Sequence, residues 1–484
     1  MNMTSTITGV RSQHPAFAAM DAKWKRCRAA VSGGDAVKEA GITYLPMLKG
    51  QDKTEYAAYK TRALFYNATW RTIDGLSGML FRKDPIVVVP ESILPMLDDV
   101  TMSGKPLTVF ARQLSHELLT TGRLGLLVDR PTTPTAGMTA AEASRLNLRP
   151  FIQLYKAETI YNWKCAWINN KYVLVEVRLS ETFTFDPDPK APFDNPKTEP
   201  RYRVLDLFEG KYRVRVYRVE DDRDEQVDGD IFPEMNGKRL DYIPFVFMGT
   251  EDLDPDVDDP SLIDLVDANL AHYRLDADYK HGLHFTGLPT ATVSGYTPQE
   301  KGEKLWVGSP TAWIFPNADA KASFLEFTGQ GLGAIVVAMQ STEQMMAILG
   351  ARMLSPDKKM AEAAETAQIH RAGELSVLAK MAGTLSMGLE KALRIFTDWS
   401  GVESKDVSIE INREFMAVTM SPQELTALIM AVQSGELSKE SLYRKLQQGD
   451  VIAEGVTFED EQTRIEIQRP NMGVPDAGGT KDAA

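Results

Sequence analysis

The sequence predicts an α+β protein in which a strand-rich stretch lies between helical ones. Residues 150–250 contain the runs KYVLVEVRLSETFTF and RYRVLDLFEGKYRVRVYRVE, where apolar and polar residues alternate as they do in half-buried strands. After residue 261 the apolar residues recur every three or four positions, which is the spacing of helices. The 484 residues suffice for two to four domains, and no internal repeat is present.

The first half of the chain is predicted to begin with helices and to continue into strands. Residues 52–82 have helical spacing, and Asp84–Pro85 ends that segment. Residues 107–131 predict a helix, a glycine-containing turn and the strand LGLLVD, followed by a loop at 131–137. Within 150–250, Glu209–Gly210 predicts the turn of a hairpin.

The second half is predicted to combine helices with short β segments. DLDPDVDDP (252–260) is an acidic linker, and Ser261 with Asp264 three residues later marks a helix start. Short β-like runs follow at 281–331, then a helix at 332–349 and a long helix that ends near Trp399. A strand at 407–412 and short capped helices complete the order, and residues 471–484 are predicted to be disordered.

The long helix carries a narrow row of apolar residues, spaced alternately by three and four. With Gly383 and Gly388 beside it, this row predicts close packing against another helix. Its members are Leu375, Leu378, Ala382, Leu385, Leu389, Ala392 and Phe396.

The net charge of −13 argues against a protein that coats nucleic acid by bulk attraction, although local basic patches such as KWKRCRA (23–29) remain. Cys27 and Cys165 match no metal-ligand spacing and suit a reducing compartment. The N-terminus lacks the apolar run of a secretory signal. The apolar stretch LGAIVVAMQSTEQMMAILG is interrupted by polar residues at 340, 341, 343 and 344, so no membrane partner is expected.

Several catalytic signatures fail on one position each. HELLT (116–120) has Thr120 where the second histidine of a zinc protease would stand. FLEFTGQGLGAI (324–335) has its last glycine one residue early for a dinucleotide fold and is followed by another helix. Neither GxxxxGK[ST] nor GxSxG occurs. We therefore expect no enzyme activity, no catalytic residues and no cofactor.

Two weaker groups of residues could hold a metal. His272, His281 and His284 lack a fourth ligand, and residues leaving a helix are the simpler interpretation. The acidic segment 252–260 has Val257 where a calcium loop needs glycine and Ile263 where it needs glutamate. A solvated linker is the simpler interpretation there, so no metal site is expected.

Three long stretches resemble the portal proteins of tailed bacteriophages, in a subgroup described only as a domain of unknown function. They are YKTRALFYNATWRTIDGLSGMLFRKDP (59–85), ELLTTGRLGLLVDRP (117–131) and YIPFVFMGTEDLDPDVDDPSLIDLVDANLAHYRLDADYKHGLHFTGLPT (242–290). The resemblance extends over about residues 50–470 and includes the order of elements.

The resemblance implies a portal fold with a β-rich wing, a two-helix stem, a clip inserted between the stem helices, a tunnel loop and a helical crown. Its segments on this chain are the N-terminal region and wing (1–260), stem helices (261–280 and 332–350), clip (281–331), tunnel loop (351–360), long helix with a returning wing strand (361–420), crown (421–470) and tail (471–484).

The resemblance also implies a dodecameric ring at one capsid vertex, through which double-stranded DNA is packaged and ejected. Arg352, Lys358 and Lys359 in the tunnel loop would then contact DNA without reading its sequence, because lysines and arginines follow phosphates. An ordinary solvated loop explains these residues equally well.

Asp264, Asp267 and Asp278 fall on one face of the first stem helix and would line the channel, where negative charge keeps DNA sliding. A solvated outer face is the alternative. In the clip, Trp306, Trp313 and Phe315 would form the docking surface for the terminase and the tail adaptor. Core packing accounts for these aromatic residues as well.

The partners implied are further copies of the chain, double-stranded DNA, the terminase large subunit, a tail adaptor, and the major capsid and scaffolding proteins. The implied location is the portal vertex of the virion, after assembly in the host cytoplasm. Two other classes remain open: a phage structural or scaffolding protein without a channel, and an enzyme with an unrecognised site.

Overall fold

The computed structural model divides into two compact units, residues 1–413 and residues 414–484. Both helices and sheets are present, as the predicted α+β class requires. The structure describes residues 9–131, 142, 145–186, 193–287, 290–295, 315, 319–325, 329–350, 364–413, 415, 422–448, 452 and 456–468.

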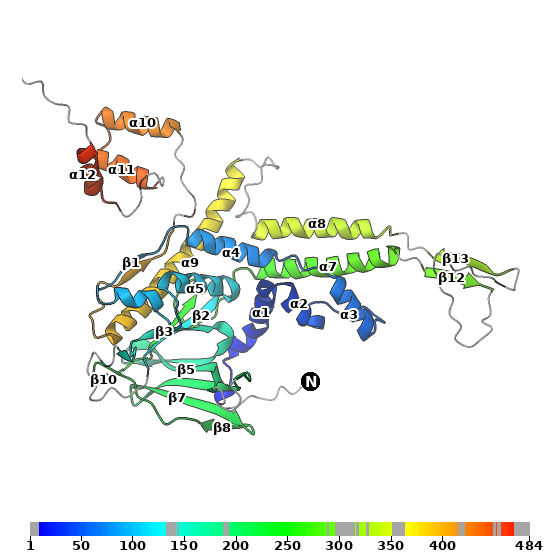
Figure 1. The fold of residues 1–484 in the computed structure, drawn as a ribbon, viewed down its shortest axis with the longest axis horizontal. Helices are drawn as coiled ribbons and strands as arrows, with labels where there is room; N and C mark the ends of the chain where they lie inside the picture. The colour runs from blue at the N-terminus through cyan, green and yellow to red at the C-terminus, as the bar shows by residue number, and fades with distance from the viewer. Residues whose placement is uncertain are drawn as a thin grey trace, which may run out of the picture. The chain divides into compact units, whose positions relative to one another are not determined.

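Helices make up the N-terminal part of the first unit (Figure 1). Buried side chains of α1, α2 and α3, among them Cys27, Val37 and Tyr59, form one cluster with Leu270 and Tyr273 from farther along the chain. The helices are α1 (Pro15–Ser32), α2 (Gly34–Glu39), α3 (Lys53–Arg62), α4 (Ala68–Leu80) and α5 (Leu107–Thr121), with short 3-10 turns at Gly9–Arg11, Gly41–Thr43, Leu94–Asp99 and Ala157–Thr159.

The prediction of one helix over 52–82 is wrong, because the chain breaks between α3 and α4. Ala63 is extended, with φ −61° and ψ 139°, and Asn67 caps α4 by accepting the Trp70 N–H at 3.0 Å. The Leu64 N–H donates to the buried carboxylate of Asp276 at 2.6 Å. A side chain more than 200 residues away therefore takes up a backbone donor that the break leaves free.

A five-stranded antiparallel sheet in the order β4-β5-β6-β7-β8 forms the strand-rich region. The hairpin predicted at Glu209–Gly210 is confirmed, and both residues have positive φ, as a type I′ turn requires. Asn169–Asn170 and Asp221–Asp222 turn in the same way. The strands are β4 (Ile160–Ile168), β5 (Lys171–Thr184), β6 (Thr198–Phe208), β7 (Lys211–Glu220) and β8 (Arg223–Gln226).

A second sheet has the order β11-β2-β3, with β2 (Arg123–Asp129) between β3 (Phe151–Lys156) and β11 (Phe245–Gly249). The predicted sequence of helix, glycine turn and strand is confirmed, since Gly122 ends α5 in the left-handed conformation at φ 74° and β2 follows at once. A small hairpin pairs β9 (Glu234–Met235) with β10 (Lys238–Arg239).

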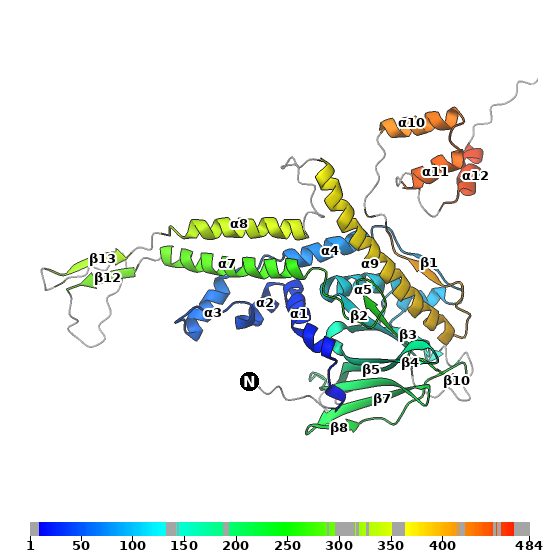
Figure 2. The same cartoon turned by 180° about the vertical axis from the view of Figure 1, so that it is seen from behind.

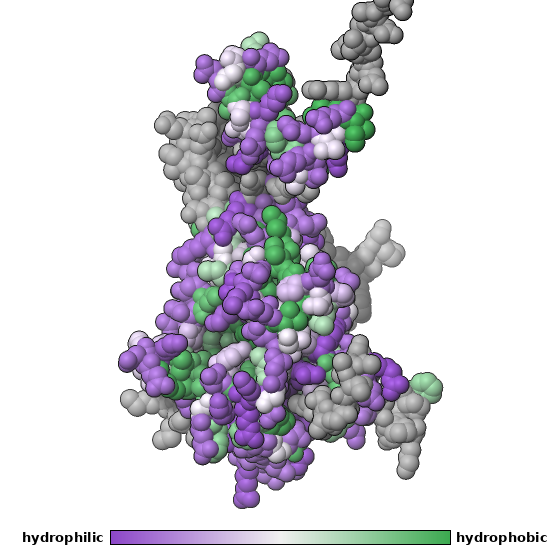
Figure 3. All heavy atoms as spheres, turned by 90° about the vertical axis from the view of Figure 1, so that its left-hand side faces the viewer, coloured by the Kyte–Doolittle hydropathy of each residue, from purple (hydrophilic) through white to green (hydrophobic). Residues whose placement is uncertain are grey.

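The strand predicted at 407–412 is present as β14 (Ser408–Glu410), which pairs antiparallel with β1 (Ile86–Val88). Ile86 and Val88 are exposed. Figure 3 views the molecule from the side that carries β1 and shows apolar patches within a mostly hydrophilic surface.

Three long helices complete the first unit: α7 (Ile263–Gly287), α8 (Leu332–Leu349) and α9 (Ala364–Trp399). Between α7 and α8, β12 (Thr290–Ser294) and β13 (Lys321–Leu325) form an antiparallel hairpin. α7 extends seven residues beyond the C-terminal end of the helix predicted at 261–280, and α8 matches the helix predicted at 332–350 closely.

Every described side chain of the predicted apolar row on α9 is buried, from Leu378 to Phe396. The expected packing against another helix is confirmed only in part, because α9 contacts α5 and α4 but packs mainly on β14, β11 and β2. Gly388 permits this contact, since a Cβ there would lie 2.6 Å from the Met248 sulfur of β11. Met381, Leu393 and Ile395 are also buried, so the apolar face is wider than the row.

The second unit contains α10 (Pro422–Gln433), α11 (Lys439–Gln448) and α12 (Phe458–Gln468). Tyr443 of α11 is buried against Phe458 of α12 with ring centroids 5.4 Å apart, and its hydroxyl donates to the Val456 carbonyl. The short helices predicted for this region are confirmed, and the tail predicted to be disordered lies outside the described residues.

Candidate functional site

The α7–α8 pair is the candidate site, because it carries most of the described residues that the sequence singled out. The two helices lie side by side and lead away from the sheets toward the β12–β13 hairpin, as both Figure 1 and Figure 2 show. Gly282 lets them approach closely, since a Cβ there would lie 2.5 Å from a methyl carbon of Leu332. At the other end, Leu265, Ala268 and Met346 pack together.

One polar contact joins the two helices. His272 of α7 lies 3.1 Å through its Nε2 from the Glu343 carboxylate of α8. The His272 side chain is almost fully buried, whereas Glu343 is exposed. The Nδ1 of His272 has no hydrogen-bond partner among the described residues. This contact joins α7 and α8 in addition to the apolar packing of Leu265, Ala268 and Met346.

The three aspartates of the predicted channel stripe are all exposed on α7, but two of them contact other helices. Asp267 forms an ion pair with Arg26 of α1 at 3.2 Å. Asp278 accepts a hydrogen bond from the Tyr59 hydroxyl of α3 at 2.5 Å. Burial and this carboxylate raise the pKa of Tyr59 well above its usual value, so the phenol stays protonated as the donor. Asp264 has no such contact within the described residues.

The basic stretch at 23–29 is neutralised within the chain. Lys25 pairs with Asp21 at 2.6 Å, and Lys23 pairs with Asp259. Arg28 binds both Glu117 and Glu158, at 2.8 and 2.5 Å. These two carboxylates raise the pKa of Arg28 despite its burial, so it remains a cation. The patch is therefore paired with carboxylates of the same chain, although the side chains of Lys23 and Lys25 are exposed.

The residues predicted to contact DNA, Arg352, Lys358 and Lys359, lie outside the described residues. Of the predicted docking aromatics, Trp306 and Trp313 also lie outside them, while Phe315 is described and half-buried. The structure therefore describes a hairpin within the predicted clip (281–331), and Phe315 is the one predicted docking residue among the described residues.

The histidines considered as metal ligands are occupied otherwise. His281 lies 3.1 Å through its Nδ1 from an Arg62 guanidinium nitrogen and packs edge-on against Tyr59 and Phe285. His116 lies 4.0 Å from Asp74. Across the residues that the structure describes, no three His, Cys, Asp or Glu side chains are placed to share a metal ion.

The acidic segment 252–260 is a structured loop rather than a free linker. Arg123 is buried and donates to the backbone carbonyls of Pro255 and Asp256 at 2.7 and 2.6 Å. Its guanidinium lies 4.2 Å from the ring centre of Trp163. Because burial disfavours its charge, the pKa of Arg123 is lowered to about 9. The loop thus closes over a cation from β2.

The feature that sequence reasoning missed is the exposed apolar surface of α8. Val337 is 65% exposed, Met345 52% and Ile348 54%, and within this helix only Met346 is buried. By length and composition α8 also qualifies as a helix that could cross a membrane, contrary to the expectation from its four polar positions. A helix that is apolar on all sides is normally buried, so the exposure of α8 indicates a surface that another molecule covers.

Comparisons with known proteins agree in part with the resemblance seen in the sequence. Residues 261–400 match the family described as a domain of unknown function, DUF4055. This range contains α7, the β12–β13 hairpin, α8 and α9. Among curated proteins no sequence matches.

The chain is similar to three solved structures, each at 11% identity. A chain in the virion of a native gene transfer agent particle has a TM-score of 0.37 and matches over 85% of this chain and 98% of its own length. One in the neck of the empty particle, computed with C6 symmetry, has 0.39 over 83% and 94%. One in the neck of the native particle, computed with C12 symmetry, has 0.37 over 84% and 98%.

Proposed function

We propose that this chain is a portal subunit: a head–tail connector that forms a ring at the unique capsid vertex of a phage-like virion. The observation that carries the proposal is the surface of the α7–α8 pair. It belongs to the stretch that resembles portal stems, and its second helix exposes large apolar side chains that its own chain leaves uncovered. Copies arranged in a ring would cover this surface, because apolar area removed from water stabilises association.

In the proposed ring the α7–α8 pairs form the stem and the β12–β13 hairpin belongs to the clip. Twelve copies are proposed from the resemblance to portal proteins. Double-stranded DNA would pass along the axis during packaging and ejection, and the clip would meet the terminase and later the tail adaptor. The capsid and scaffolding proteins would surround the wing, after assembly in the host cytoplasm.

The DNA contacts proposed are Arg352, Lys358 and Lys359, one set from each copy. Duplex DNA carries about one negative charge per 1.7 Å, so a ring of such side chains can follow its phosphates without reading sequence. Of the proposed acidic stripe, Asp264 is the member best placed to repel the duplex, because Asp267 and Asp278 bind α1 and α3. With a Debye length of about 8 Å, only charges near the DNA count.

The first test is the absolute mass of the purified chain by light scattering, with negative-stain images of the same fraction. We expect particles of about twelve times 53.8 kDa with a central hole. A uniform monomer with and without the capsid and scaffolding proteins would contradict the proposal and favour a non-channel structural protein. Flotation of the chain with liposomes in place of ring formation would instead point to membrane insertion of α8.

The second test concerns the DNA contacts alone. A Lys358→Ala, Lys359→Ala double variant should still form rings but package less DNA or retain it less well, with a weaker salt dependence of retention. The matched control is Lys211→Ala together with Lys171→Ala, two exposed lysines at hairpin turns of the five-stranded sheet. Equal packaging by the two double variants would remove the lysine pair from the proposed DNA contacts.

A further inference from the structure

The outer strand of the three-stranded sheet has a partly unpaired edge. β3 pairs on one side with β2, in the register Phe151 to Asp129 through Lys156 to Leu124. In an antiparallel ladder alternate residues direct both their N–H and C=O to the same side. The Val128 N–H of β2 donates to Pro244, on the β11 side, and the Ile152 N–H donates to Val100, outside the sheet. The backbone N–H and C=O groups of Ile152, Leu154 and Lys156 therefore point away from β2.

These three outward positions differ in what they contact. Val100 accepts from the Ile152 N–H at 2.8 Å, and the Lys156 carbonyl accepts from the Thr159 hydroxyl at 2.8 Å. Between them, the Leu154 N–H and C=O have no hydrogen-bond partner among the described residues. Leu154 is also only half-buried. Backbone groups of this kind form a template for an added strand.

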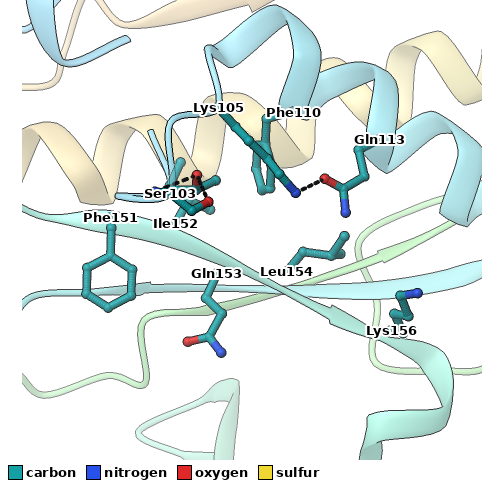
Figure 4. A pocket seen from close by; sticks show the side chains of 10 residues that line it. Ser103, Lys105, Phe110, Gln113, Phe151, Ile152, Gln153, Leu154 and Lys156 are labelled. Atoms are coloured by element: carbon teal, nitrogen blue, oxygen red, sulfur yellow. Dashed lines mark hydrogen bonds between the residues drawn. The ribbon is translucent and has the colours of Figure 1, made fainter. Parts of the chain in front are cut away.

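A cavity of about 340 Å³ lies along this edge. We call it the β3 groove. Its lining comes from the start of α5, from the loop that precedes it and from β3 itself, as Figure 4 shows. The lining residues are Thr101, Ser103, Lys105, Phe110, Gln113, Phe151, Ile152, Gln153, Leu154 and Lys156. The groove thus combines an open strand edge with apolar and hydrogen-bonding side chains.

The charge of the β3 groove is positive. Among the described residues that line it, Lys105 and Lys156 are ionised and none carries a carboxylate. The Lys105 ammonium donates to the neutral side chain of Gln113 at 2.9 Å, so its charge is not cancelled there (Figure 4). Lys156 lies 3.5 Å from Glu117, which offsets part of its charge. Lys105 is therefore the stronger attraction for an anionic group.

We propose that the β3 groove binds an extended acidic segment of a partner protein by strand addition. One residue of that segment forms backbone hydrogen bonds with Leu154, the position next to the one that Val100 occupies. A neighbouring Asp or Glu side chain forms an ion pair with Lys105. Main-chain hydrogen bonds supply a sequence-tolerant contact, and the lysines select for acidic side chains. The inference stands apart from ring formation, since all its residues belong to one copy.

The test uses the purified full chain and a fluorescein-labelled, end-capped peptide Glu-Val-Glu-Val-Glu-Val, followed by fluorescence anisotropy. We expect saturable binding that weakens as salt rises. Lys105→Glu should weaken it by about tenfold, because one attraction becomes a repulsion. Lys211→Glu, at an exposed hairpin turn far from the groove in sequence, should leave it unchanged.

Leu154→Pro tests the backbone contact separately. Proline removes the N–H, which at this position points outward, and edge strands tolerate proline, so the sheet keeps its ladder to β2 while the outward backbone donor is lost. Thermal melting checks the fold of the Leu154→Pro variant. If that variant melts at a lower temperature than the wild-type chain, the test rests on Lys105→Glu. The proposal is overturned if the wild-type chain shows no saturable binding. Binding that survives Lys105→Glu, or equal binding of Lys-Val-Lys-Val-Lys-Val, overturns it as well.

Discussion

Buried polar side chains of α7 hold the chain that precedes α4 in place. Asn269 is fully buried, and its carbonyl oxygen accepts from the Thr69 N–H at 3.2 Å and from the Thr69 hydroxyl at 2.9 Å. Its amide nitrogen donates to the Tyr66 carbonyl at 2.6 Å. The Tyr66 carbonyl also accepts from the Ala68 N–H at 2.8 Å, so the two groups of Thr69 are the ones that depend on Asn269.

Replacing Asn269 by leucine, which is close to it in size, should leave the N–H and the hydroxyl of Thr69 without a hydrogen-bond partner. Each unsatisfied buried polar group costs about 1–3 kcal/mol, so we expect the free energy of unfolding to fall by about 2 kcal/mol or more. Urea denaturation followed by circular dichroism measures this change. A loss below about 1 kcal/mol would mean that water reaches the site and that Asn269 does not hold the turn.

His14 makes the stability of the fold depend on pH. Its Nδ1 caps α1 by accepting the Ala16 N–H at 3.2 Å, and its ring stacks on Trp163 at 4.0 Å. Burial first, and then the charge of Arg123, lower the pKa of His14 below its usual value. The unfolded chain therefore binds a proton at a higher pH than the folded chain, and stability is lost as the pH falls through about 6.5.

A His14→Asn variant should show a smaller loss of stability between pH 7.5 and 5.5 than the wild-type chain. Asparagine keeps an acceptor for the cap but does not titrate, so the cap survives acidification. Denaturant midpoints at several pH values measure the slope. The same slope in both proteins would assign the pH dependence to other groups, of which His116 and His281 also have lowered pKa values.

The contacts of single residues could be predicted from the sequence only where the partners lie close together along the chain. The type I′ turn at Glu209–Gly210 was predictable, because both strands and the turn are adjacent. The basic stretch at 23–29 looked like an exposed patch, because its acidic partners Glu117, Glu158 and Asp267 lie far along the chain. Short sequence patterns do not identify partners that lie so far apart along the chain.

At the scale of elements, α9 shows how one small residue sets a packing distance. The helix lies on β11 and β14, and Gly388 faces Met248, which is fully buried and has little room to move. Gly383, on the same helix, faces only the end of the Arg413 side chain at 3.5 Å from a Cβ. Within the same helix, Gly388 therefore faces a buried side chain with little room to move, whereas Gly383 faces the end of a flexible one.

Gly388→Ala and Gly383→Ala should have opposite effects on stability. Alanine favours a helix over glycine by about 1 kcal/mol, and this gain should appear at position 383. At position 388 the overlap with Met248 should outweigh it, with a net loss of about 1–2 kcal/mol. Thermal unfolding of both variants tests the prediction. Shortening Met248 to alanine in the Gly388→Ala background should cost less than it does in the wild-type chain.

The elements were predictable where their signals are local. The helix at 107–121, the following strand and the apolar face of α9 follow from spacing and from Gly122. The break at 63–67 was not predictable, because Asp276 and Asn269 of α7 supply its hydrogen bonds. The partners of α9 were also hidden, since an apolar row fits a sheet as well as a helix.

At the scale of the whole molecule, the proposed ring depends on the exposed side of α8. Ile348→Glu should leave the monomer folded, because this side chain is 54% exposed, but it should prevent ring assembly. Val109→Glu is the matched control, since Val109 lies on a helix and is also 54% exposed. Light scattering gives the mass of each variant, and melting temperatures within about 2 °C of wild type show that the fold is kept.

Equal assembly of both variants would show that the α8 face lies outside the contacts between copies. Loss of assembly in both would point to a general effect of added charge. Only the predicted asymmetry supports an interface on α8.

The pairing of β1 with β14 also fixes when the first unit can be completed during synthesis. Val88 of β1 cannot pair until Ser408, its partner in β14, has been synthesised. At roughly 5–20 residues per second, a ribosome needs about 16 to 64 s to make the intervening chain. Until then the β1 backbone has no strand beside it, and α9 lacks β14, on which it packs. A nascent chain is therefore unready to join other copies, and any factor that shields β1 must act before translation ends.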